Sequence, residues 1–344
     1  MIHMDLQARL SDTQQPPLVI AEAADAHYGS LSRAKEMVGA AFEAGADVIK
    51  FQHHLPSEEM LREIPLSSNM KEPLWDFLET NALSIDEHVE LASFCSSVGI
   101  TFACTPFSLQ AAREIEEGVQ PLFYKIGSGE MLDFPTLAEI AAFGRPMFVS
   151  TGMSTVEEVD EMYEFLSPLV KDLTLLNCTS AYPTDPSEMH LGFLTEMQVR
   201  YPGATIGHSE HSASNHFSLA AVALGARVIE RHVTIDASLS GPDAEVSLTF
   251  DDLSRFIQEV REVHASLTVP KKIQPGEKET RLWAHRSLVY LEDLPAGHIL
   301  NGSEFWGKRP GTGIPARQRD LFVGKTLRRD VLHDTLLGRL DFLD

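Results

Sequence analysis

The chain has 344 residues, of which 43% are hydrophobic and 23% charged, and its formal net charge is −22 at pH 7. This length exceeds what one hydrophobic core usually covers, so we expect one large domain of about 250 residues and a smaller one. A strongly acidic protein repels phosphate groups, which argues against nucleic acid and anionic membranes as partners.

The N-terminus and the cysteines bear on the compartment. Residues 1–17 contain no apolar segment of the signal-peptide type. No apolar run in the chain reaches the roughly 18 residues needed to span a bilayer. The three cysteines, Cys95, Cys104 and Cys178, form no CxxC pair, which argues against a disulfide framework. We therefore expect a cytoplasmic protein in which only the first fifteen or so residues lack order.

Eight short apolar runs recur along the chain, each rich in Val, Ile and Leu and too short for a helix. Continuous apolar runs of this length indicate strands that are buried on both faces, as in a parallel sheet. The runs are 18–24, 47–52, 100–107, 122–128, 146–152, 173–180, 204–210 and 227–233.

Amphipathic segments separate these runs, and four of them carry helix start or stop signals. Eight strands alternating with helices predict a (β/α)₈ barrel, with a doubly wound open sheet as the alternative. We favour the barrel because polar residues gather at the C-terminal ends of nearly all runs. The resemblance of residues 43–52 to 223–232 also indicates repeated units. The four segments are 30–45, 85–99, 155–166 and 214–225.

The composition changes after Leu267. Residues 268–283 are rich in Pro, Gly and charge, which predicts a linker. Short apolar stretches broken by Pro-Ala-Gly and Pro-Gly turns follow over 284–344, which predicts a small β-rich domain. The predicted organisation is thus a barrel domain over 1–267, a linker and a β-rich domain.

Two lysines, Lys50 and Lys125, end separate predicted strands. Thr105 ends another, and Ser128 and Ser150 lie in Gly-rich segments nearby. In a barrel these strand ends build the active site. Lysines, hydroxyls and backbone N–H groups together suit a phosphate. The alternative is that each lysine reaches out to solvent from its strand.

His211 follows the seventh run and His232 ends the eighth, so neighbouring strands bring them together. Glu22 ends the first run, which adjoins the eighth after closure of the barrel. Two imidazoles and a carboxylate suit a divalent metal such as Mn, Zn, Co or Fe. The alternative is a set of hydrogen-bonded core groups. We assign ordinary structural roles to four further histidines, His53, His54, His88 and His216.

The chain resembles the sialic acid synthases and their relatives that make legionaminic, pseudaminic and other nonulosonic acids, including relatives in spore coat polysaccharide formation. The resemblance covers about 16–344, and its tail looks like the antifreeze-like (SAF) domain of that family. The motifs are IAE (20–22), HYG (27–29), AGADVIKFQ (44–52), TPFS (105–108), YKIGSGE (124–130), STGMST (150–155), CTSAYPT (178–184), GHSEHS (207–212), ALGARVIERHVTID (223–236), GPD (241–243), RSLV (286–289) and KRPGTGI (308–314).

The resemblance implies roles for individual residues. It places His211 and His232 on a divalent metal, usually Mn²⁺, with Glu22 beside them and Glu130 handling the attacking water. It also implies a domain-swapped homodimer in which Arg309 reaches the partner's barrel. The remaining substrate-binding residues would be Lys50, Thr105, Lys125 and Ser128 for phosphoenolpyruvate, Gln52, Asn69, Tyr182 and Asp243 for an amino sugar, and Ser209 with no substrate assigned to it.

The implied reaction joins phosphoenolpyruvate to an open-chain N-acetylated hexosamine aldehyde and releases phosphate by C–O cleavage. Three residues depart from the family pattern: Ala26 before His27, Ser180, and Glu210 before His211. These departures keep two alternatives open. One is a phosphoenolpyruvate-dependent aldol synthase for a different sugar. The other is an inactive carbohydrate-binding relative in envelope or spore polysaccharide assembly.

Overall fold

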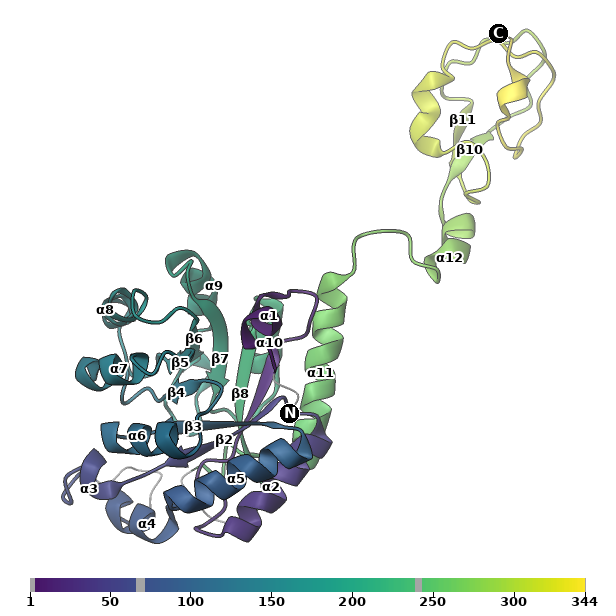
Figure 1. Ribbon diagram of the computed structural model, residues 1–344. Helices are drawn as coiled ribbons and strands as arrows, with labels where there is room; N and C mark the ends of the chain where they lie inside the picture. Colours follow the sequence, from purple (N-terminus) through teal and green to yellow (C-terminus); the bar gives the residue numbers. More distant parts are fainter. Residues whose placement is uncertain (1–3, 66–71, 239–242, 344) are drawn as a thin grey trace. The chain divides into compact units, whose positions relative to one another are not determined.

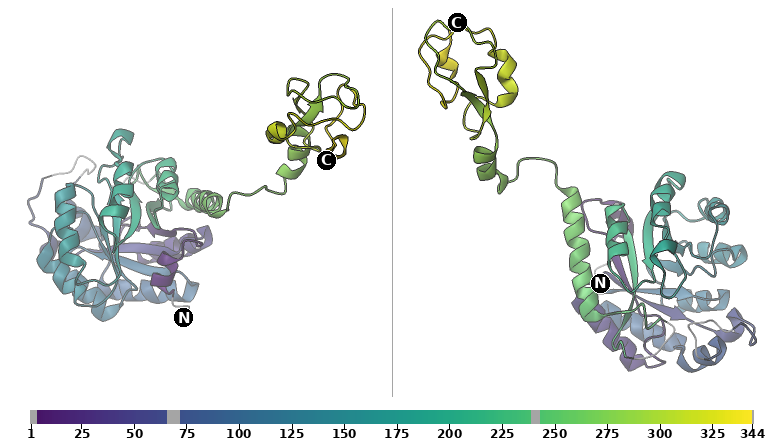
Figure 2. Two further views of the ribbon diagram at one scale, coloured as in Figure 1. Left: turned by 90° about the horizontal axis from the view of Figure 1, so that it is seen from above. Right: turned by 180° about the vertical axis from the view of Figure 1, so that it is seen from behind.

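The computed structural model of the protein describes residues 4–65, 72–238 and 243–343. The chain divides into two compact units, residues 1–269 and 270–344, and each has a hydrophobic core of its own. Figures 1 and 2 show the barrel unit in purple to green and the second unit in light green to yellow. The division falls near the start of the predicted linker.

Eight parallel strands form a closed barrel in the first unit. Each strand pairs with the next, and β8 pairs with β1, which confirms the barrel and excludes the open sheet. All eight predicted runs are strands. Their bounds are β1 (Leu18–Glu22), β2 (Val48–His53), β3 (Thr101–Pro106), β4 (Tyr124–Ile126), β5 (Met147–Ser150), β6 (Leu173–Cys178), β7 (Thr205–Glu210) and β8 (Val228–Thr234).

Helices surround the barrel (Figure 1). The four predicted helical segments are confirmed as α2, α5, α8 and α10, whereas α3 and α4, which follow β2, were not predicted. The bounds are α2 (Leu31–Ala44), α3 (Pro56–Glu59), α4 (Leu74–Asn81), α5 (Ile85–Val98), α6 (Leu109–Gly118), α7 (Phe134–Ala141), α8 (Val156–Leu166), η1 (Pro186–Glu188), α9 (Leu191–Arg200), α10 (His216–Ala223), a short β9 (Leu248–Thr249) and α11 (Phe250–Thr268).

Local signals fix where these helices begin and end. The Ser30 hydroxyl accepts from the backbone of Arg33 at the start of α2, and Gly45 ends that helix at φ 89°. Ser84 and Glu87 form a capping box at the start of α5. A residue with a side chain would be strained at Gly45, because positive φ favours glycine.

The N-terminal segment closes the bottom of the barrel. Residues Leu6–Ser11 form α1, whose Leu6 and Leu10 are buried against the apolar barrel interior. The Arg227 guanidinium, at the start of β8, donates to the carbonyls of Leu10 and Asp12. The expectation that the first fifteen or so residues lack order was therefore wrong for this helix. Two leucines four residues apart give α1 one apolar face, which is enough to cover the exposed end of a barrel core.

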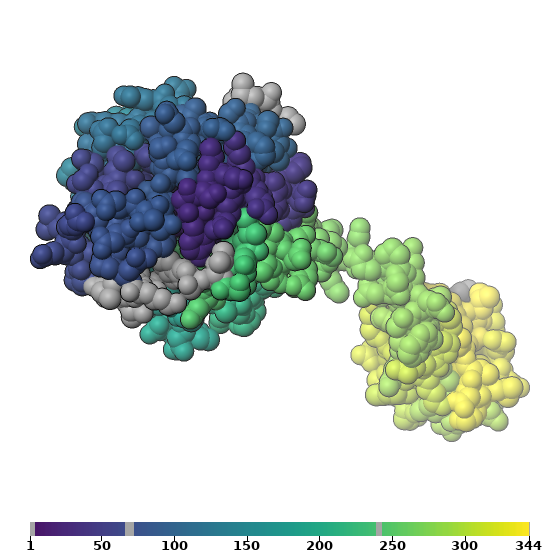
Figure 3. Space-filling view, turned by 90° about the horizontal axis from the view of Figure 1, so that it is seen from below, coloured from purple at the N-terminus to yellow at the C-terminus, as the bar shows by residue number. Residues whose placement is uncertain are grey.

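The second unit is small and β-rich, as predicted. Its antiparallel hairpin of β10 (Ser287–Tyr290) and β11 (Phe305–Lys308) packs against irregular segments that contain η2 (Ala316–Leu321) and η3 (Arg339–Asp341). The helix α12 (Glu277–Ala284) occupies part of the predicted linker. Figure 3 shows the surface of each of the two compact units in a space-filling view. Over the described residues, no helix has the length and apolar character needed to cross a membrane.

Candidate active site

Strand alternation determines which side chains enter the barrel. Residues two apart on a strand face the same side. Leu18 and Ile20 of β1 belong to the apolar interior cluster, so Glu22 also faces inward. The same alternation carries Val48 of β2 to Lys50 and Gln52. A layer of polar and charged groups therefore lies above the apolar layer, at the C-terminal ends of the strands.

Lys50 and Glu22 form a buried ion pair in this layer. The Lys50 Nζ lies 2.5 Å from Glu22 Oε2, and their side chains are 3% and 1% exposed. Lys50 also donates to Thr105 Oγ1 of β3 at 2.9 Å. Burial alone would lower the pKa of Lys50, but Glu22 and Glu230 together raise it above its ordinary value. The two carboxylates therefore favour the charged form of Lys50 in the barrel interior.

Lys125 of β4 is compensated much less. Its Nζ donates to the Ile126 carbonyl at 3.0 Å, and its nearest carboxylate is Glu230 Oε1 at 3.8 Å. Burial lowers the pKa of Lys125, and the attraction of Glu230 only partly opposes this. A buried ammonium with one distant counter-ion favours an incoming anion.

Glu230 of β8 links the two lysines. It lies 4.0 Å from Lys50 and 3.8 Å from Lys125, and it accepts a hydrogen bond from Ser209 Oγ at 3.1 Å. Burial alone would raise its pKa, but the two lysines lower it. From the sequence, Glu230 stands with His232 among the polar residues at the strand ends, but we predicted no specific role for it. Its spacing indicates one, because it stands two residues before His232 on the same strand and shares its inward face.

The Gly-rich turns after β4 and β5 form a polar rim. Ser128 Oγ accepts from the Gly152 N–H at 3.0 Å, and a Cβ at Gly152 would overlap the hydroxyls of both Ser128 and Ser180. A Cβ at Gly127 would overlap Glu130 Oε2. The backbone therefore approaches these side chains closely. Hydroxyls and amides gathered in this way can surround an oxyanion.

Glu130 has a buried carboxyl group with one unpartnered oxygen. Its Oε2 is buried without a hydrogen-bond partner, and burial raises the pKa of the carboxyl group, with Lys125 opposing the shift. A carboxylate whose proton affinity is raised in this way is a better general base than an exposed one.

His211 and His232 meet as predicted, with ring centroids 5.2 Å apart. The Nδ1 of His211 donates to the Thr179 carbonyl at 2.8 Å, which leaves Nε2 with its lone pair, 3.1 Å from the Tyr182 hydroxyl. The Nδ1 of His232 is buried without a hydrogen-bond partner and lies 3.5 Å from Asp243 Oδ2.

This donor set fits a divalent metal with two protein ligands. The residues that the structure describes contain no group of three or more His, Cys, Asp or Glu arranged to hold a metal. His211 Nε2, which faces the Tyr182 hydroxyl, and the unpartnered Nδ1 of His232 could each bind the metal. Two protein ligands would leave the other coordination positions to water and substrate, as catalytic metal sites require.

Gln52 and His54 lie together at the mouth of the barrel. Gln52 donates to Glu22 Oε1 at 2.8 Å, and its own carbonyl oxygen is 2.9 Å from Nε2 of His54. His54 therefore lies near the site, although we predicted a structural role for it.

A cavity opens beside His232. Two carboxylates, and no lysine or arginine, are among the described residues around the cavity. These are Ala23, Ala24, Asp25, Ala26, Tyr28, Phe77, His232, Thr234, Asp243, Ala244 and Ser247.

Asp25 was missed by the sequence analysis. Its side chain is 14% exposed, and its Oδ1 has no hydrogen-bond partner. Burial raises the pKa of Asp25 to about 6; His54 opposes the shift and Asp243 adds to it. A single carboxylate after the first strand gave no motif that could have identified it.

Two predicted substrate residues cannot be compared with this site. Asn69 lies outside the described residues. Arg309 belongs to the second unit, where its guanidinium lies 5.1 Å from the centre of the Trp283 ring and its Nε donates to the Ala284 carbonyl at 3.3 Å. Its action in a partner's barrel stays a prediction. The other predicted site residues lie at the C-terminal end of the barrel.

Each of the two units matches a known protein family or domain. Residues 37–272 match the model of the NeuB family, and residues 285–342 match the SAF domain. The human N-acetylneuraminate-9-phosphate synthase is 34% identical over 83% of this chain and 81% of its own length. The N,N'-diacetyllegionaminic acid synthase of Campylobacter jejuni is 31% identical over 93% of this chain and 98% of its own. The pseudaminic acid synthase of that species is 32% identical over 96% and 98%.

Solved structures show the same architecture. The sialic acid synthetase of Leptospira borgpetersenii, crystallised with citrate, superposes with a TM-score of 0.70 at 26% identity, over 78% of this chain and 90% of its own. A spore coat polysaccharide biosynthesis protein of Bacillus subtilis covers 96% of both chains, with a TM-score of 0.66 at 27% identity.

Proposed function

Because this chain belongs to the NeuB family, we propose that it condenses phosphoenolpyruvate with an open-chain N-acetylated hexosamine aldehyde to give a nonulosonic acid and phosphate. The observation that carries the proposal is the pair of buried lysines, Lys50 and Lys125, facing one carboxylate of β8 beside two histidines. Two buried cations suit a small, highly charged anion, and the two neighbouring imidazoles suit an aldehyde-activating metal.

Phosphoenolpyruvate would bind with its charged groups on the lysine side. Nearby carboxylates compensate the charge of Lys125 less than that of Lys50. Lys125 would therefore contact the phosphate, together with the hydroxyl of Ser128 and the amides of the two Gly-rich turns. Lys50 and Thr105 would complete the contacts. Ser209, hydrogen-bonded to Glu230, would keep that carboxylate turned toward the lysines.

A divalent metal, which we propose to be Mn²⁺, would be held by His211 and His232 and would supply Lewis-acid polarisation of the aldehyde oxygen. The carbon–carbon bond forms when C3 of phosphoenolpyruvate attacks the aldehyde carbon. Glu22, which lies opposite His232 in the strand register, would relay a proton from water to the new hydroxyl.

Water then adds at C2 of the former phosphoenolpyruvate. Glu130, with its raised pKa and unpartnered oxygen, would accept the proton of this water. The tetrahedral intermediate expels phosphate by cleavage of the C2–O bond, leaving a carbonyl at C2. The lysines stabilise the negative charge on phosphate throughout, because they are fixed in a buried site before the reaction begins.

The acceptor sugar would lie over the cavity beside His232. Gln52, Tyr182 and Asp243 would contact it, with Asn69 as a further proposed contact. Asp25 and Asp243 are the two carboxylates among the described lining residues, and they would repel a phosphorylated sugar. We therefore include in the proposal an unphosphorylated acceptor.

The proposed enzyme is a cytoplasmic homodimer. Its three cysteines are free and buried, as in a reducing compartment. In the dimer, Arg309 of one chain would enter the barrel of its partner and contact the sugar. Light scattering gives the oligomeric state, and an Arg309→Ala variant that stays dimeric should lose affinity for the sugar rather than for phosphoenolpyruvate.

The test of the proposed function is phosphate release from phosphoenolpyruvate with Mn²⁺ across a panel of 2-acetamido and 2,4-diacetamido hexoses. Wild type should release phosphate with at least one sugar, and Lys125→Ala should lose about 10²-fold or more of the rate. Lys35→Ala is the matched control, because Lys35 pairs with Glu90 at the surface. Absence of release with every sugar, together with absence of phosphoenolpyruvate binding, would favour the inactive relative.

A further inference from the structure

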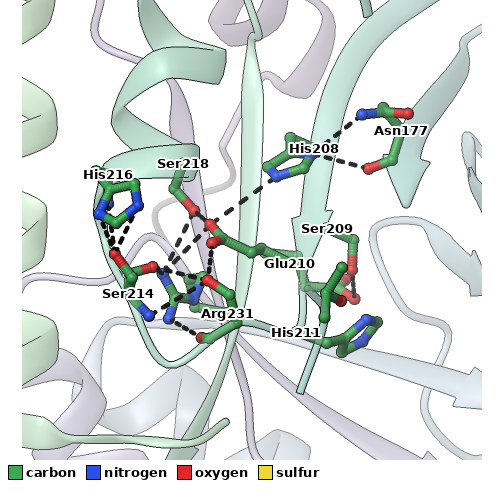
Figure 4. Close-up of polar contacts among 12 residues, drawn as sticks. Asn177, His208, Ser209, Glu210, His211, Ser214, His216, Ser218 and Arg231 are labelled. Carbon is green, nitrogen blue, oxygen red and sulfur yellow. Dashed lines mark hydrogen bonds and ion pairs between the residues drawn. The ribbon is translucent and has the colours of Figure 1, made fainter. Parts of the chain in front are cut away.

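Glu210 and Arg231 form a buried pair behind the two histidines. They are directly opposite each other in the register of β7 and β8, and they are 1% and 0% exposed. The preceding residues of these strands, Ser209 and Glu230, face into the barrel and hydrogen-bond to each other. Glu210 and Arg231 therefore point out of the barrel, into the layer beneath the surrounding helices (Figure 4).

The pair holds the turn that follows His211. Arg231 Nη2 donates to the Ser212 carbonyl at 2.9 Å, and Nη1 donates to the Ser214 carbonyl at 3.0 Å. Glu210 Oε2 lies 3.4 Å from Arg231 Nη1, and the carboxylate also accepts from the hydroxyl of Ser218 (Figure 4). It accepts from the hydroxyl of Ser212 as well. The two charged side chains thus connect the ends of β7 and β8 with the 212–214 turn and the start of α10.

Each member of the pair directly precedes one histidine of the site. Glu210 is followed by His211, and Arg231 is followed by His232. A displacement of either strand end, or of the 212–214 turn, changes the separation of the two imidazoles. We propose that the Glu210–Arg231 pair is a positioning device that sets the His211–His232 separation for metal binding. This inference rests on the metal site of the proposed function.

The chemistry of arginine explains why this position needs a planar fork. One guanidinium reaches two carbonyls and a carboxylate at once, whereas a lysine ammonium is a point charge that cannot keep the same geometry. The guanidinium also lies 5.5 Å from the centre of the Phe256 ring of α11, which restricts its plane. Removal of Glu210 would leave Arg231 without its charge partner in a buried layer, which is costly.

The experiment measures Mn²⁺ binding to the full-length, metal-free protein by electron paramagnetic resonance, and phosphoenolpyruvate binding separately by calorimetry. Arg231→Lys should weaken Mn²⁺ binding about 10- to 100-fold, as loss of support behind a metal ligand does. Its phosphoenolpyruvate affinity should stay within about twofold of wild type, because the lysines are held by other strands. A purely structural role would change neither constant in the folded protein.

A matched control comes from the far end of the barrel. Arg145 donates two hydrogen bonds to Glu116, at 2.6 and 2.8 Å, and precedes β5. Arg145→Lys should lower the melting temperature and leave Mn²⁺ affinity unchanged. If Arg231→Lys does not fold, Ser212→Ala, which removes one hydroxyl from Glu210, should still weaken Mn²⁺ binding severalfold.

Two results would overturn the inference, and only one of them would also reject the proposed metal site. If wild type binds Mn²⁺ and both Arg231→Lys and Ser212→Ala bind it with the same dissociation constant, the positioning role alone is rejected. Failure of wild type to bind Mn²⁺ would reject the metal site and the positioning role together. Phosphate release dependent on an amino sugar would then still support the condensation itself.

Discussion

Lys50 Nζ lies 2.5 Å from Glu22 Oε2, inside a barrel where less than one-twentieth of either side chain reaches solvent. The site therefore contains its own counter-ions before any substrate arrives. Glu230 contributes to the same balance by facing both Lys50 and Lys125. Binding of phosphoenolpyruvate then adds an anion to a nearly balanced set. The more weakly compensated Lys125 is the cation best placed to receive it.

Replacement of Glu230 by Gln should destabilise the free enzyme and make its stability depend on ligand. Lys50 would keep its ion pair with Glu22, whereas Lys125 would lose the carboxylate that lies 3.8 Å from it. Loss of one partner of a buried ion pair costs about 3–5 kcal/mol, or roughly 10 °C in melting temperature. Saturating phosphoenolpyruvate should raise the melting temperature more in Glu230→Gln than in wild type. Thermal unfolding with and without ligand measures this, and equal shifts in the two proteins would contradict the shared-counter-ion account.

Phosphoenolpyruvate affinity should fall on the alkaline side at a pH below the ordinary lysine pKa of 10.5, because burial lowers the pKa of Lys125. The ammonium form attracts the anion and the neutral amine does not, so affinity is full below the lowered pKa and is lost above it. Calorimetric titration over a pH series measures the midpoint. Lys125→Arg, which stays charged, should shift this loss to higher pH. An identical pH profile in wild type and variant would assign the titration to another group.

Much of this architecture could be predicted from the sequence. Eight apolar runs gave eight strands because strands buried on both faces need continuous apolar residues. Lys50, Lys125, His211 and His232 stood out because each interrupts or follows such a run. Glu230 also ends such a run, but its place between the two lysines could not be predicted from its own strand. Its role follows from pairing across strands that are far apart in sequence.

Helix α1 and the residues at the barrel mouth were missed for a related reason. Leu6 and Leu10 provide only two apolar positions, and their burial depends on the floor of a barrel closed by β1 and β8. His54 follows β2 in a loop, and its contact with Gln52 follows from the turn geometry. Local pattern identifies elements, whereas contacts between loops depend on the completed fold.

The barrel should lose stability as the pH falls below 6.5. His27 and His88 are buried, and burial lowers the pKa of His27 to about 4 and that of His88 well below 6.5. Both are neutral in the folded protein and take up a proton near pH 6.5 when unfolded. Acid therefore favours the unfolded chain, by about 1.4 kcal/mol per pH unit for each group until the folded-state pKa is reached.

Denaturant unfolding at neutral pH and near pH 5 measures this loss. The His88→Phe variant, which removes two ring nitrogens without hydrogen-bond partners, should show a smaller loss than wild type. The exposed His190, replaced by Asn, is the control and should behave as wild type. A pH dependence that is unchanged in His88→Phe would show that other groups cause the acid sensitivity.

The charge of the acceptor sugar should be selected in part by Asp25. Wild type should prefer an unphosphorylated acceptor to its 6-phosphate, because Asp25 and Asp243 line the cavity beside His232. Asp25→Asn should lower the ratio of kcat/KM for the unphosphorylated acceptor to kcat/KM for its 6-phosphate by about tenfold. The reason is that the substitution removes one like-charge repulsion of about 1.4 kcal/mol. Asp86→Asn, on the exposed face of α5, is the control. An unchanged ratio in Asp25→Asn would remove this residue from acceptor selection.

The most direct test of the condensation uses phosphoenolpyruvate labelled with ¹⁸O in the bridge between C2 and phosphorus. The account predicts that phosphate appears only when an amino-sugar acceptor is present, and that mass spectrometry finds the label in that phosphate, since the C2–O bond breaks. Label retained in the organic product, or phosphate released at the same rate without acceptor, would contradict the account.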